Sequence, residues 1–536
     1  MARTRKSRRN FSALLHVALL SALAGSAAPA LAQGEVRAAP VIGKSLRYCN
    51  PLPIPLGQGA AASGDVTVIR EKDKYYMYCT GGGAWVSGDL VNWEYHAVQG
   101  RVPVAPDVVK YNGYFYMCGN NDNGGDLFRS TDPLGPFEDL GPWKNTGDAT
   151  TGWANAFDMK IFVDTDNKPY LYFPGRAEKG IYVVPLKPDD LTTFEGTPKH
   201  LFAFDPDHIW ERYGEMNEYP DVSWVEGPWI FKHGDTYYLQ YSASGTQWKT
   251  YATGMYKGPG ATGPFTYQPT NPLLRKTDGV VTGPGHGCAV QAPDGTWWQF
   301  YTIVFGNPPG GRRIGMDPYG FDKDGNAFVH GPTETPQWAP GVIPDPAEHN
   351  DSGSIPVTIN KLRAMNAQSS FSSQKPGHDA AYAIDNSNGT WWEPADDDAQ
   401  PTLTVDLSPA TRFDPVQTFT IDSARILFNG GGGAGGRGGR GAGRGAAPVP
   451  VPTASAPAGP PVSAYQYKIE ASADGQTYQV VLDRTGNAVS RNTVFDEFPP
   501  TTARFVRLTV TNWPRNGGPL GVIEFTVFGK PIRLIK

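Results

Sequence analysis

Five stretches of the chain share one pattern of apolar and polar positions. Each begins with a short apolar run, passes a polar turn built around Asp, Asn or Gly, and returns as a run rich in Tyr, Trp and Phe. This pattern is typical of a β-hairpin. The five stretches lie at residues 64–80, 105–119, 157–175, 225–242 and 287–302.

Repetition of one hairpin five times predicts a repeat architecture built from strands. Further strand-like segments, such as DLFRSTD and TGMYKGPGATGPFT, lie between the hairpins. We therefore predict an all-β fold with a five-bladed β-propeller over residues 33–345. In such a fold the first strand of each blade runs along the central axis, so the residues at the heads of these strands face a shared cavity.

The pattern changes after the fifth hairpin. Residues 346–356 read as a linker, and residues 357–536 contain alternating strands that predict a β-sandwich. Within that sandwich, residues 429–464 consist mostly of Gly, Ala, Arg and Pro and offer almost nothing to bury. We expect this insertion to be a disordered loop.

The N-terminus has the features of a secretion signal. Residues 1–32 combine an Arg- and Lys-rich head, a short apolar centre and Ala-Leu-Ala before Gln33. Residues 7–11, Ser-Arg-Arg-Asn-Phe, resemble a twin-arginine signal, whose pathway carries folded proteins. We expect a periplasmic or secreted protein with no stable membrane span, because the apolar centre is short and no later run is longer.

Composition and charge narrow the class of protein. The 536 residues include 64 Gly, 49 Pro, 25 Tyr, 25 Phe and 14 Trp, which favours short strands and tight turns over long helices. The formal net charge is −5 and no basic face is apparent, so we expect no nucleic-acid partner. The four cysteines form no C-x-x-C pair that would indicate zinc, and we expect buried, reduced thiols.

Charged residues are predicted at the head of each first strand: Asp65, Asp107, Asp158, Glu226 and His286. Any one of them alone is more often a turn or cap residue. Four carboxylates at equivalent places in five repeats indicate a shared function, because carboxylates that converge in a cavity raise one another's pKa. Such clusters carry out chemistry or hold a cation.

Glycoside hydrolysis suits this set of residues, because one acid can protonate the leaving oxygen while another activates water or attacks the sugar. Trp153, Trp224 and Trp229 are candidates for sugar-stacking subsites, although hairpin packing explains each equally well. Metal-assisted hydrolysis is a weaker alternative, since a hard-ion site needs a tighter group of Asp residues.

Three motifs resemble glycoside hydrolase family 43. They are Glu226-Gly227-Pro228, Gly285-His286-Gly287 and Ala105-Pro106-Asp107, each followed by an aromatic hairpin. The resemblance runs from about Asn50 to Gly341. It implies a five-bladed propeller that hydrolyses α-L-arabinofuranosides, β-D-xylosides or some galactosides with inversion at the anomeric carbon.

The resemblance also implies roles for individual residues. Asp65 matches the general base, although Gly64-Asp65-Val66 departs from the usual Ala-Asp-Pro of the family. Asp158 matches the aspartate that tunes the pKa of the acid, and Glu226 matches the general acid. His286 matches a histidine that helps to hold calcium through water, and no organic cofactor is implied.

Two further residues are assigned less sharply. Asp107 matches an aspartate that is structural or lines the site. Arg313, or its neighbour Arg312, is a candidate for binding a sugar hydroxyl, with an outer-strand salt bridge as the alternative.

The C-terminal region resembles the discoidin, or coagulation factor type C, domain. The resemblance rests on Ala383, Asp385, Thr390 and Trp392. It implies glycan binding, and the alternative is a domain that only braces the propeller. A catalytically inactive glycan-binding protein is therefore the second hypothesis for the whole chain. A retaining fructan hydrolase would need a motif such as Asn-Asp-Pro-Asn-Gly, which the sequence lacks.

Overall fold

The computed structural model describes residues 46–57, 61–120, 125–175, 179–305, 311–359, 370–408, 418–430, 464–515 and 518–532. The predicted signal segment, residues 1–32, and nearly all of the predicted insertion at 429–464 lie outside these ranges. The described residues are almost entirely strands and turns, so the all-β prediction is confirmed. Among them, no helix is both long and apolar enough to cross a membrane.

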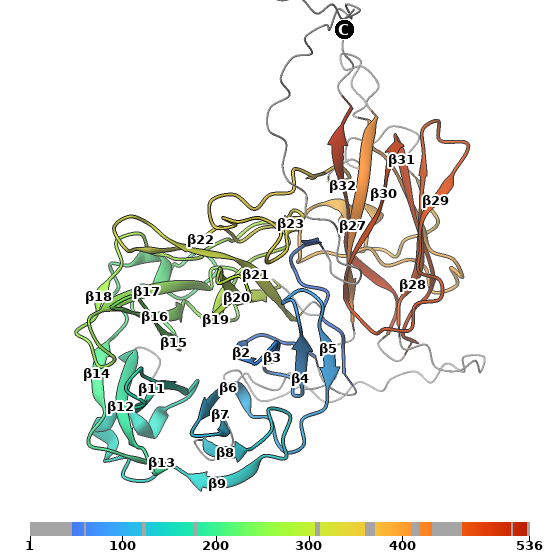
Figure 1. Cartoon of the computed structure of the whole chain (residues 1–536). Coiled ribbons are helices and arrows are strands. Elements are labelled where there is room, and N and C mark those ends of the chain that lie inside the picture. Colours follow the sequence, from blue (N-terminus) through green and yellow to red (C-terminus); the bar gives the residue numbers. More distant parts are fainter. Residues whose placement is uncertain are drawn as a thin grey trace, which may run out of the picture. The chain divides into compact units, whose positions relative to one another are not determined.

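Five antiparallel sheets follow one another between residues 67 and 329 (Figure 1). The first sheet contains β2 (Thr67–Glu71), β3 (Lys74–Tyr78), β4 (Ala84–Ser87) and β5 (Glu94–His96). The second contains β6 (Val104–Tyr111), β7 (Tyr114–Asn120), β8 (Asp126–Ser130) and β9 (Glu138–Pro142). The third contains β10 (Lys160–Val163), β11 (Pro169–Pro174), β12 (Ile181–Lys187) and β13 (Asp190–Phe194), with β14 (Lys199–Phe202) paired to β12.

The last two sheets of this five-sheet region have the same order. The fourth contains β15 (Glu226–His233), β16 (Thr236–Ala243), β17 (Ala252–Gly258) and β18 (Thr266–Tyr267). The fifth contains β19 (Gly285–Gln291), β20 (Trp297–Val304), β21 (Arg312–Phe321) and β22 (Ala327–Val329). Two short strands flank the five sheets in sequence and pair with each other: β1 (Arg47–Tyr48) and β23 (Gln337–Trp338).

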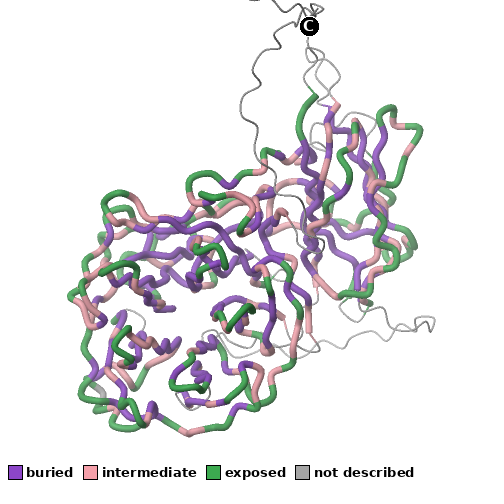
Figure 2. Tube along the Cα trace, viewed as in Figure 1, coloured by how far each residue is buried: buried purple, intermediate pink, exposed green. Residues whose placement is uncertain are grey.

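The first strand of each sheet is its link to the neighbouring sheets. Contacts join β2 to β6, β6 to β10, β10 to β15, β15 to β19, and β19 to β2. Apolar side chains fill the spaces between successive sheets; for example, Tyr172 and Ile181 of the third sheet share one cluster with Leu239 and Tyr241 of the fourth. In Figure 2 the buried stretches follow the strands, while exposed stretches lie mainly at the turns.

The C-terminal strands form two sheets, so the predicted β-sandwich is confirmed. One sheet has the order β24 (Ile355–Pro356), β32 (Gly521–Pro531), β27 (Phe419–Asn429), β30 (Thr493–Ala503). The other has the order β25 (Ser370–Phe371), β26 (Thr402–Asp406), β31 (Phe505–Asn512), β28 (Gln466–Ser472), β29 (Gln479–Asp483). The end of the predicted linker therefore already belongs to the sandwich, because Ile355 and Pro356 pair with β32.

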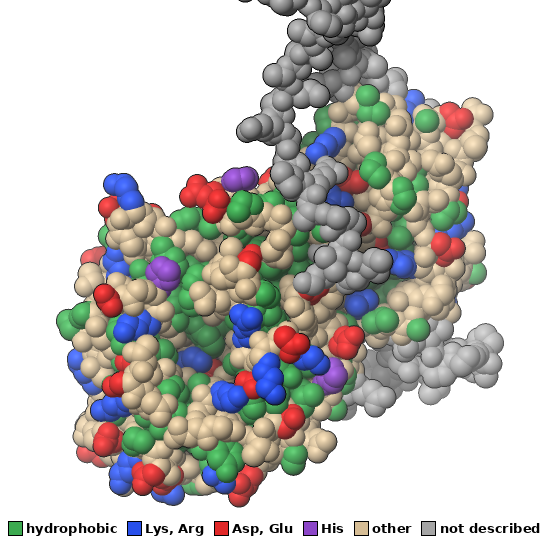
Figure 3. Space-filling view, in the orientation of Figure 1, with side chains coloured by type: hydrophobic (Ala, Val, Ile, Leu, Met, Phe, Trp, Pro, Cys, Tyr) green, Lys and Arg blue, Asp and Glu red, His purple; other side chains and the backbone are tan. Residues whose placement is uncertain are grey.

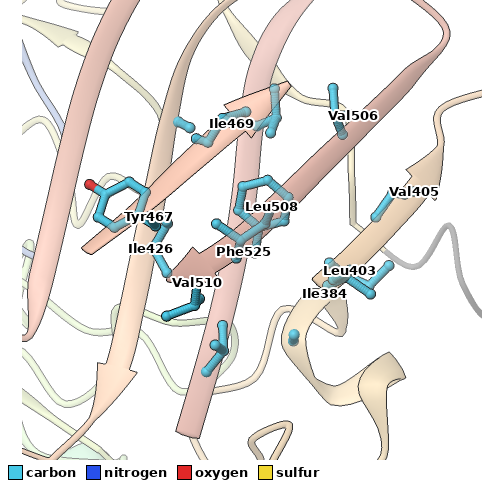
Figure 4. Close-up of a cluster of buried hydrophobic side chains, with 14 of the residues drawn as sticks. Ile384, Leu403, Val405, Ile426, Tyr467, Ile469, Val506, Leu508, Val510 and Phe525 are labelled. Atoms are coloured by element: carbon cyan, nitrogen blue, oxygen red, sulfur yellow. The ribbon is translucent and has the colours of Figure 1, made fainter. Parts of the chain in front are cut away.

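Alternation of inward and outward residues builds the core of the sandwich. Figure 4 shows Ile426 of β27 and Phe525 of β32 facing Leu403, Leu508 and Ile469 of the other sheet. Short 3-10 helices complete the described secondary structure: η1 (Ala149–Thr151), η2 (Trp153–Asn155), η4 (Ile209–Glu211) and η5 (Ala380–Ile384). The four cysteines, Cys49, Cys79, Cys118 and Cys288, are buried and free, as the sequence predicted.

Candidate active site

The heads of three first strands contain the same irregularity. The pairing register shifts between Val104 and Asp107 in β6, between Glu226 and Trp229 in β15, and between Gly285 and Cys288 in β19. Each shift is a β-bulge with one extra residue on the first strand. Bulges re-aim side chains and are frequent beside active sites.

A left-handed backbone conformation occurs at one equivalent position in all five sheets. The φ angles are +52° at Asp65, +49° at Ala105, +46° at Asp158, +55° at Gly227 and +33° at His286. A non-glycine residue at positive φ costs about 1–2 kcal/mol. Strain of this kind persists where the surrounding structure enforces it, and it is common at functional sites.

The prediction that Asp65, Asp107, Asp158, Glu226 and His286 occupy equivalent positions was wrong in part. Asp65, Asp158 and His286 are equivalent, since each is the positive-φ residue of its sheet. Glu226 lies one residue earlier than Gly227, and Asp107 lies two residues later than Ala105. The acidic residues stand at different offsets from the positive-φ position, and the sequence motifs do not show these offsets.

Asp65 is a buried carboxylate held by cations and hydroxyls. Arg312 Nη1 donates to Asp65 Oδ1 over 2.7 Å, and Thr80 Oγ1 donates to Oδ2 over 2.5 Å. His286 Nδ1 lies 3.3 Å from Oδ1. Burial alone would raise the pKa of Asp65, but the Arg312 and His286 charges outweigh it and hold this pKa well below its usual range.

Asp158 is buried beside the segment that carries Glu226. Asn120 binds it twice, since Asn120 Nδ2 donates to Asp158 Oδ1 over 2.9 Å and the Asp158 N–H donates to Asn120 Oδ1 over 2.6 Å. The Gly227 N–H also donates to its carboxylate. Burial raises the pKa of Asp158, and the His286 charge opposes that rise.

Glu226 is the first residue of β15 and is buried. Its Oε1 accepts a hydrogen bond from the Tyr251 hydroxyl over 2.7 Å. Burial, and next the negative charge of Asp158, raise the pKa of Glu226 to about 8. A carboxyl group in this setting keeps its proton at neutral pH, which is the state that a general acid requires.

His286 joins the carboxylates from the head of β19. Its Nδ1 lies 3.3 Å from Asp65 Oδ1 and 3.5 Å from Asp158 Oδ2. Burial opposes a charge on the ring, but the two carboxylates outweigh it and raise the pKa of His286 to about 9. Only glycine fits beside it at position 227, because a Cβ there would lie 2.8 Å from the His286 ring.

Asp107 and Trp229 each lie two residues beyond the positive-φ residue of their strand. Asp107 Oδ1 accepts from Lys160 Nζ over 2.7 Å, and its Oδ2 accepts from the Ile161 N–H over 3.0 Å. The Lys160 Nζ also sits 3.6 Å from the Trp229 ring centroid. Both residues therefore contact other buried groups of the protein, which favours structural roles over the predicted sugar binding.

Trp153 and Trp224 differ in exposure, since Trp153 is half-buried and Trp224 is exposed. Trp153 packs edge-on against Phe173 and Phe194, with ring centroids 5.1 Å apart in both cases. Trp224 remains 37% exposed, and its ring meets the edge of Phe157, the residue before Asp158, at 5.8 Å. Of the three predicted tryptophans, Trp224 is the most exposed.

Arg312, and not the predicted Arg313, reaches the carboxylates. The two residues are consecutive in β21, so their side chains point to opposite faces of the sheet. The Arg313 guanidinium lies 5.0 Å from the Phe305 ring centroid and donates to the Arg312 carbonyl over 3.1 Å.

The resemblance implies that His286 helps to hold a calcium ion through water. Calcium takes six to eight oxygen ligands. Both oxygens of Asp65 and both of Asp107 already accept from other groups, and the Nδ1 of His286 faces two carboxylates. Within the described ranges, no group of three or more His, Cys, Asp or Glu residues is arranged to hold a metal. A calcium ion held by His286 through water, as the resemblance implies, stays a prediction.

Sequence reasoning missed three residues that shape the site. Asn120 ends β7, Tyr251 precedes β17, and Thr80 follows β3, so all three lie outside the first strands that carry the motifs. The repeat pattern identifies the first strand of each sheet. It does not show which side chains from later segments lie beside the heads of these strands.

The site contains buried carboxyl groups at the heads of repeated strands, and one of them is kept protonated while another is kept ionised. This arrangement defines an all-β protein with an acid–base site. The chain belongs to glycosyl hydrolases family 43, whose profile matches residues 55–327. Residues 453–525 match the F5/8 type C domain. Both families expected from the sequence are thereby confirmed.

Relatives with curated names come from several organisms. The chain is 29% identical over 246 residues to a "Beta-D-galactofuranosidase xynD" of Aspergillus niger, covering 41% of this chain and 64% of the relative. It is 25% identical over 292 residues to a "Xylan 1,3-beta-xylosidase" of Vibrio sp, covering 48% and 49%. The chain thus spans about half to two thirds of the length of these relatives.

Among solved structures, one titled "Crystal structure of a thermostable family-43 glycoside hydrolase" is 29% identical to this chain. The match covers 55% of this chain and 99% of that one, with a TM-score of 0.46.

Proposed function

We propose that this protein is an inverting glycoside hydrolase that cleaves arabinofuranosyl, xylosyl or galactosyl linkages. One observation carries the proposal: two buried carboxyl groups of one site are held in opposite protonation states. The pKa of Glu226 is raised to about 8, while that of Asp65 is held well below its usual range. Groups whose surroundings push their pKa values apart are suited to be the acid and the base of one reaction.

Each residue then has a role in the reaction. Glu226 donates its proton to the oxygen of the leaving sugar as the glycosidic bond breaks. Asp65 accepts a proton from the water that attacks the anomeric carbon from the opposite face. Asp158 keeps Glu226 protonated before the reaction, because its negative charge disfavours a second negative charge nearby.

We further propose that the five sheets are the blades of a closed five-bladed propeller. The contact of β19 with β2 supports this arrangement, since it joins the last sheet to the first. The pairing of β1 with β23 supports it as well, because these strands come from opposite ends of the five-sheet region. Such a fold would direct the heads of all five first strands toward one axis.

The substrate is proposed to be a glycan, and the family membership and the names of the relatives support this class. Trp224 and Phe157 precede Glu226 and Asp158 in the sequence and present an aromatic edge on which a sugar ring could stack. On the face seen in Figure 3, acidic and basic side chains are interspersed, which suits a substrate without strong charge. The N-terminal segment, residues 1–32, supports export to the site of such glycans.

A panel of nitrophenyl glycosides tests the proposal. The wild type and Glu226→Gln are incubated with α-L-arabinofuranoside, β-D-xyloside, β-D-galactofuranoside and β-D-galactopyranoside, and the first product anomer is read by NMR. We expect the wild type to release an inverted sugar from at least one of them. A retained anomer would contradict the assigned mechanism, and binding of glycans without hydrolysis would favour the inactive glycan-binding protein.

A further inference from the structure

Exposed apolar side chains are concentrated in one loop, between β14 and β15. Among the residues that the structure describes, twelve large hydrophobic side chains are exposed, and five of them lie between Ile209 and Trp224. Met216 is 82% exposed, Tyr219 is 50% exposed, and Val222 is also exposed. Exposed apolar groups that gather in one place mark a binding surface more often than scattered ones do. We call the segment from Ile209 to Trp224 the apolar loop.

Hydrogen bonds give the apolar loop a defined shape. The Tyr213 N–H donates to the Val222 carbonyl over 2.8 Å, and the Tyr219 N–H donates to the Tyr213 carbonyl over 3.1 Å. The two sides of the loop therefore lie beside each other, with Met216 in the turn between them. Asn217 is buried in this turn, and its amide group donates to two carbonyl oxygens of the loop over 2.6 and 3.2 Å.

A buried carboxyl group anchors both ends of the apolar loop. Glu211 is 1% exposed, and its side chain accepts from the Tyr241 hydroxyl over 2.5 Å and from the Asp205 N–H over 3.2 Å. His208 Nδ1 lies 2.9 Å from the same carboxyl group. The Ser223 hydroxyl donates to the Glu211 carbonyl over 2.6 Å. The loop thus presents its apolar side chains on a fixed frame, which lowers the entropic cost of binding a ligand.

The apolar loop ends beside the acid–base site. Its last residue, Trp224, lies two positions before Glu226 in the chain. The Trp224 ring meets the edge of the Phe157 ring, with centroids 5.8 Å apart, and Phe157 directly precedes Asp158. An extended ligand that reaches Glu226 and Asp158 therefore has this aromatic pair next to it.

A second segment joins the apolar loop to the acid–base site. The Trp248 ring meets the Tyr213 ring edge-on, with centroids 5.6 Å apart. Thr250 Oγ1 donates to a carbonyl oxygen of the apolar loop over 2.7 Å. The next residue, Tyr251, donates its hydroxyl hydrogen to Glu226. The segment that holds the proposed general acid thus also supports the apolar loop.

The chemistry of the apolar loop suits a neutral glycan chain. Between its apolar side chains it exposes the carboxylates of Glu215, Glu218 and Asp221, and Arg212 is its one basic residue. Aromatic rings stack on the C–H faces of sugars, and carboxylates accept hydrogen bonds from hydroxyl groups. The excess of negative charge disfavours an acidic polysaccharide or an anionic lipid surface.

We infer that the apolar loop binds a neutral polysaccharide chain next to the acid–base site, so that the protein acts on long chains in preference to short glycosides. The preference for long chains rests on the proposed function, because it concerns the chain that is cleaved. The binding of a chain to the loop does not require cleavage and can be measured without it.

The first test compares substrates of increasing length. The double variant Met216→Ala/Tyr219→Ala removes two exposed side chains of the apolar loop. Tyr114→Ala is the matched control, because Tyr114 is an exposed aromatic residue of β7, outside the loop. The measured quantity is the ratio of kcat/KM on arabino-, xylo- or galacto-oligosaccharides to kcat/KM on the matching nitrophenyl glycoside.

In the wild type we expect this ratio to rise with the length of the oligosaccharide. The double variant should lower the ratio for the longest oligosaccharide about five- to tenfold, while Tyr114→Ala keeps the wild-type ratio. A ratio that does not rise with length, or that is the same in the double variant and the wild type, would overturn the inference while the proposed function holds.

The second test measures binding in the absence of cleavage. Glu226→Gln, with and without the double change in the apolar loop, migrates through native gels that contain arabinan, arabinoxylan, galactan or the acidic polymer polygalacturonate. We expect at least one neutral polymer to retard Glu226→Gln, the loop change to weaken this retardation, and polygalacturonate to have no effect. This result would support the inference even if the wild type hydrolyses no glycoside.

Three results of the second test would overturn the inference. They are equal retardation with and without the loop change, no retardation by any neutral polymer, and stronger retardation by polygalacturonate. Light scattering supplies a further check. A dimer of the wild type that the double variant abolishes would assign the apolar loop to contact with a second copy of the chain, and would also overturn the inference.

Discussion

Arg312 Nη1 lies 2.7 Å from Oδ1 of Asp65, although the two residues are 247 positions apart in the chain. Asp65 precedes the first strand of the first sheet, and Arg312 begins the third strand of the fifth sheet. This ion pair holds the proposed base in its ionised state. It also ties together the two ends of the five-sheet region.

Removal of this guanidinium should shift the acid limb of the pH profile. In Arg312→Met the pKa of Asp65 rises toward its usual range, because the largest stabilising charge is gone. We expect kcat/KM to fall at least about tenfold at low pH, with the acid limb at higher pH than in the wild type. Arg313→Met is the matched control: it removes a neighbouring arginine that faces away from Asp65. An acid limb that moves equally in both variants would show that Arg312 acts through stability alone.

Loss of the Asp158 charge should shift the alkaline limb of the pH profile of kcat/KM. The protonated form of Glu226 is the active one, so activity should fall as pH rises through about 8. Asp158→Asn removes a negative neighbour and lowers the pKa of Glu226, so the alkaline limb should shift to lower pH. The pH dependence of kcat/KM measures this directly. A limb that stays in place or moves upward would contradict the assigned role of Asp158.

His286 should make stability depend on pH in a defined window. Its pKa is raised from 6.5 to about 9 in the folded protein, so its contribution is fully present below 6.5 and is lost as pH rises through about 9. The free energy of unfolding of the wild type should therefore lose up to about 3 kcal/mol from this group across that window. His286→Gln lacks this loss, and the gap between the two proteins should narrow as pH rises. Parallel curves from chemical denaturation would argue that His286 is not charged.

The two tryptophans with different surroundings should give different phenotypes. Trp224→Ala removes an exposed ring and should raise KM for oligosaccharides about five- to tenfold, at nearly unchanged stability. Trp153→Ala removes a ring packed against Phe173 and Phe194 and should cost about 3 kcal/mol of unfolding free energy. Steady-state kinetics and denaturant unfolding of both variants separate the effects. Equal KM values for Trp224→Ala and the wild type would remove this residue from the substrate site.

The sequence predicted the strands well because their chemistry repeats. Five hairpins with apolar and aromatic runs mark the first two strands of every sheet, and the structure places strands in all five stretches. The outer strands are shorter, from two residues in β18 to five in β9, and the pairing of β14 with β12 has no signature in the pattern.

From the sequence, only the site residues on or just before the first strands could be predicted. Asp65, Asp158, Glu226 and His286 were found because motifs precede hairpins. The position of Asp107 was not, because it lies two residues beyond the positive-φ residue Ala105, and its motif does not show this offset. The choice between Arg312 and Arg313 was also open, since one residue of register decides which face of β21 each side chain takes.

The dependence of rate on the leaving group tests the central claim most directly. Glycosides with a poor leaving group need a proton from Glu226, whereas a dinitrophenyl glycoside leaves as a stable anion without one. For Glu226→Gln we therefore expect kcat to fall by about 10²–10⁴ on an alkyl glycoside or oligosaccharide and to remain close to the wild-type value on the dinitrophenyl glycoside. An equal loss on both substrates, or no loss on either, would contradict the assignment of Glu226 as the general acid.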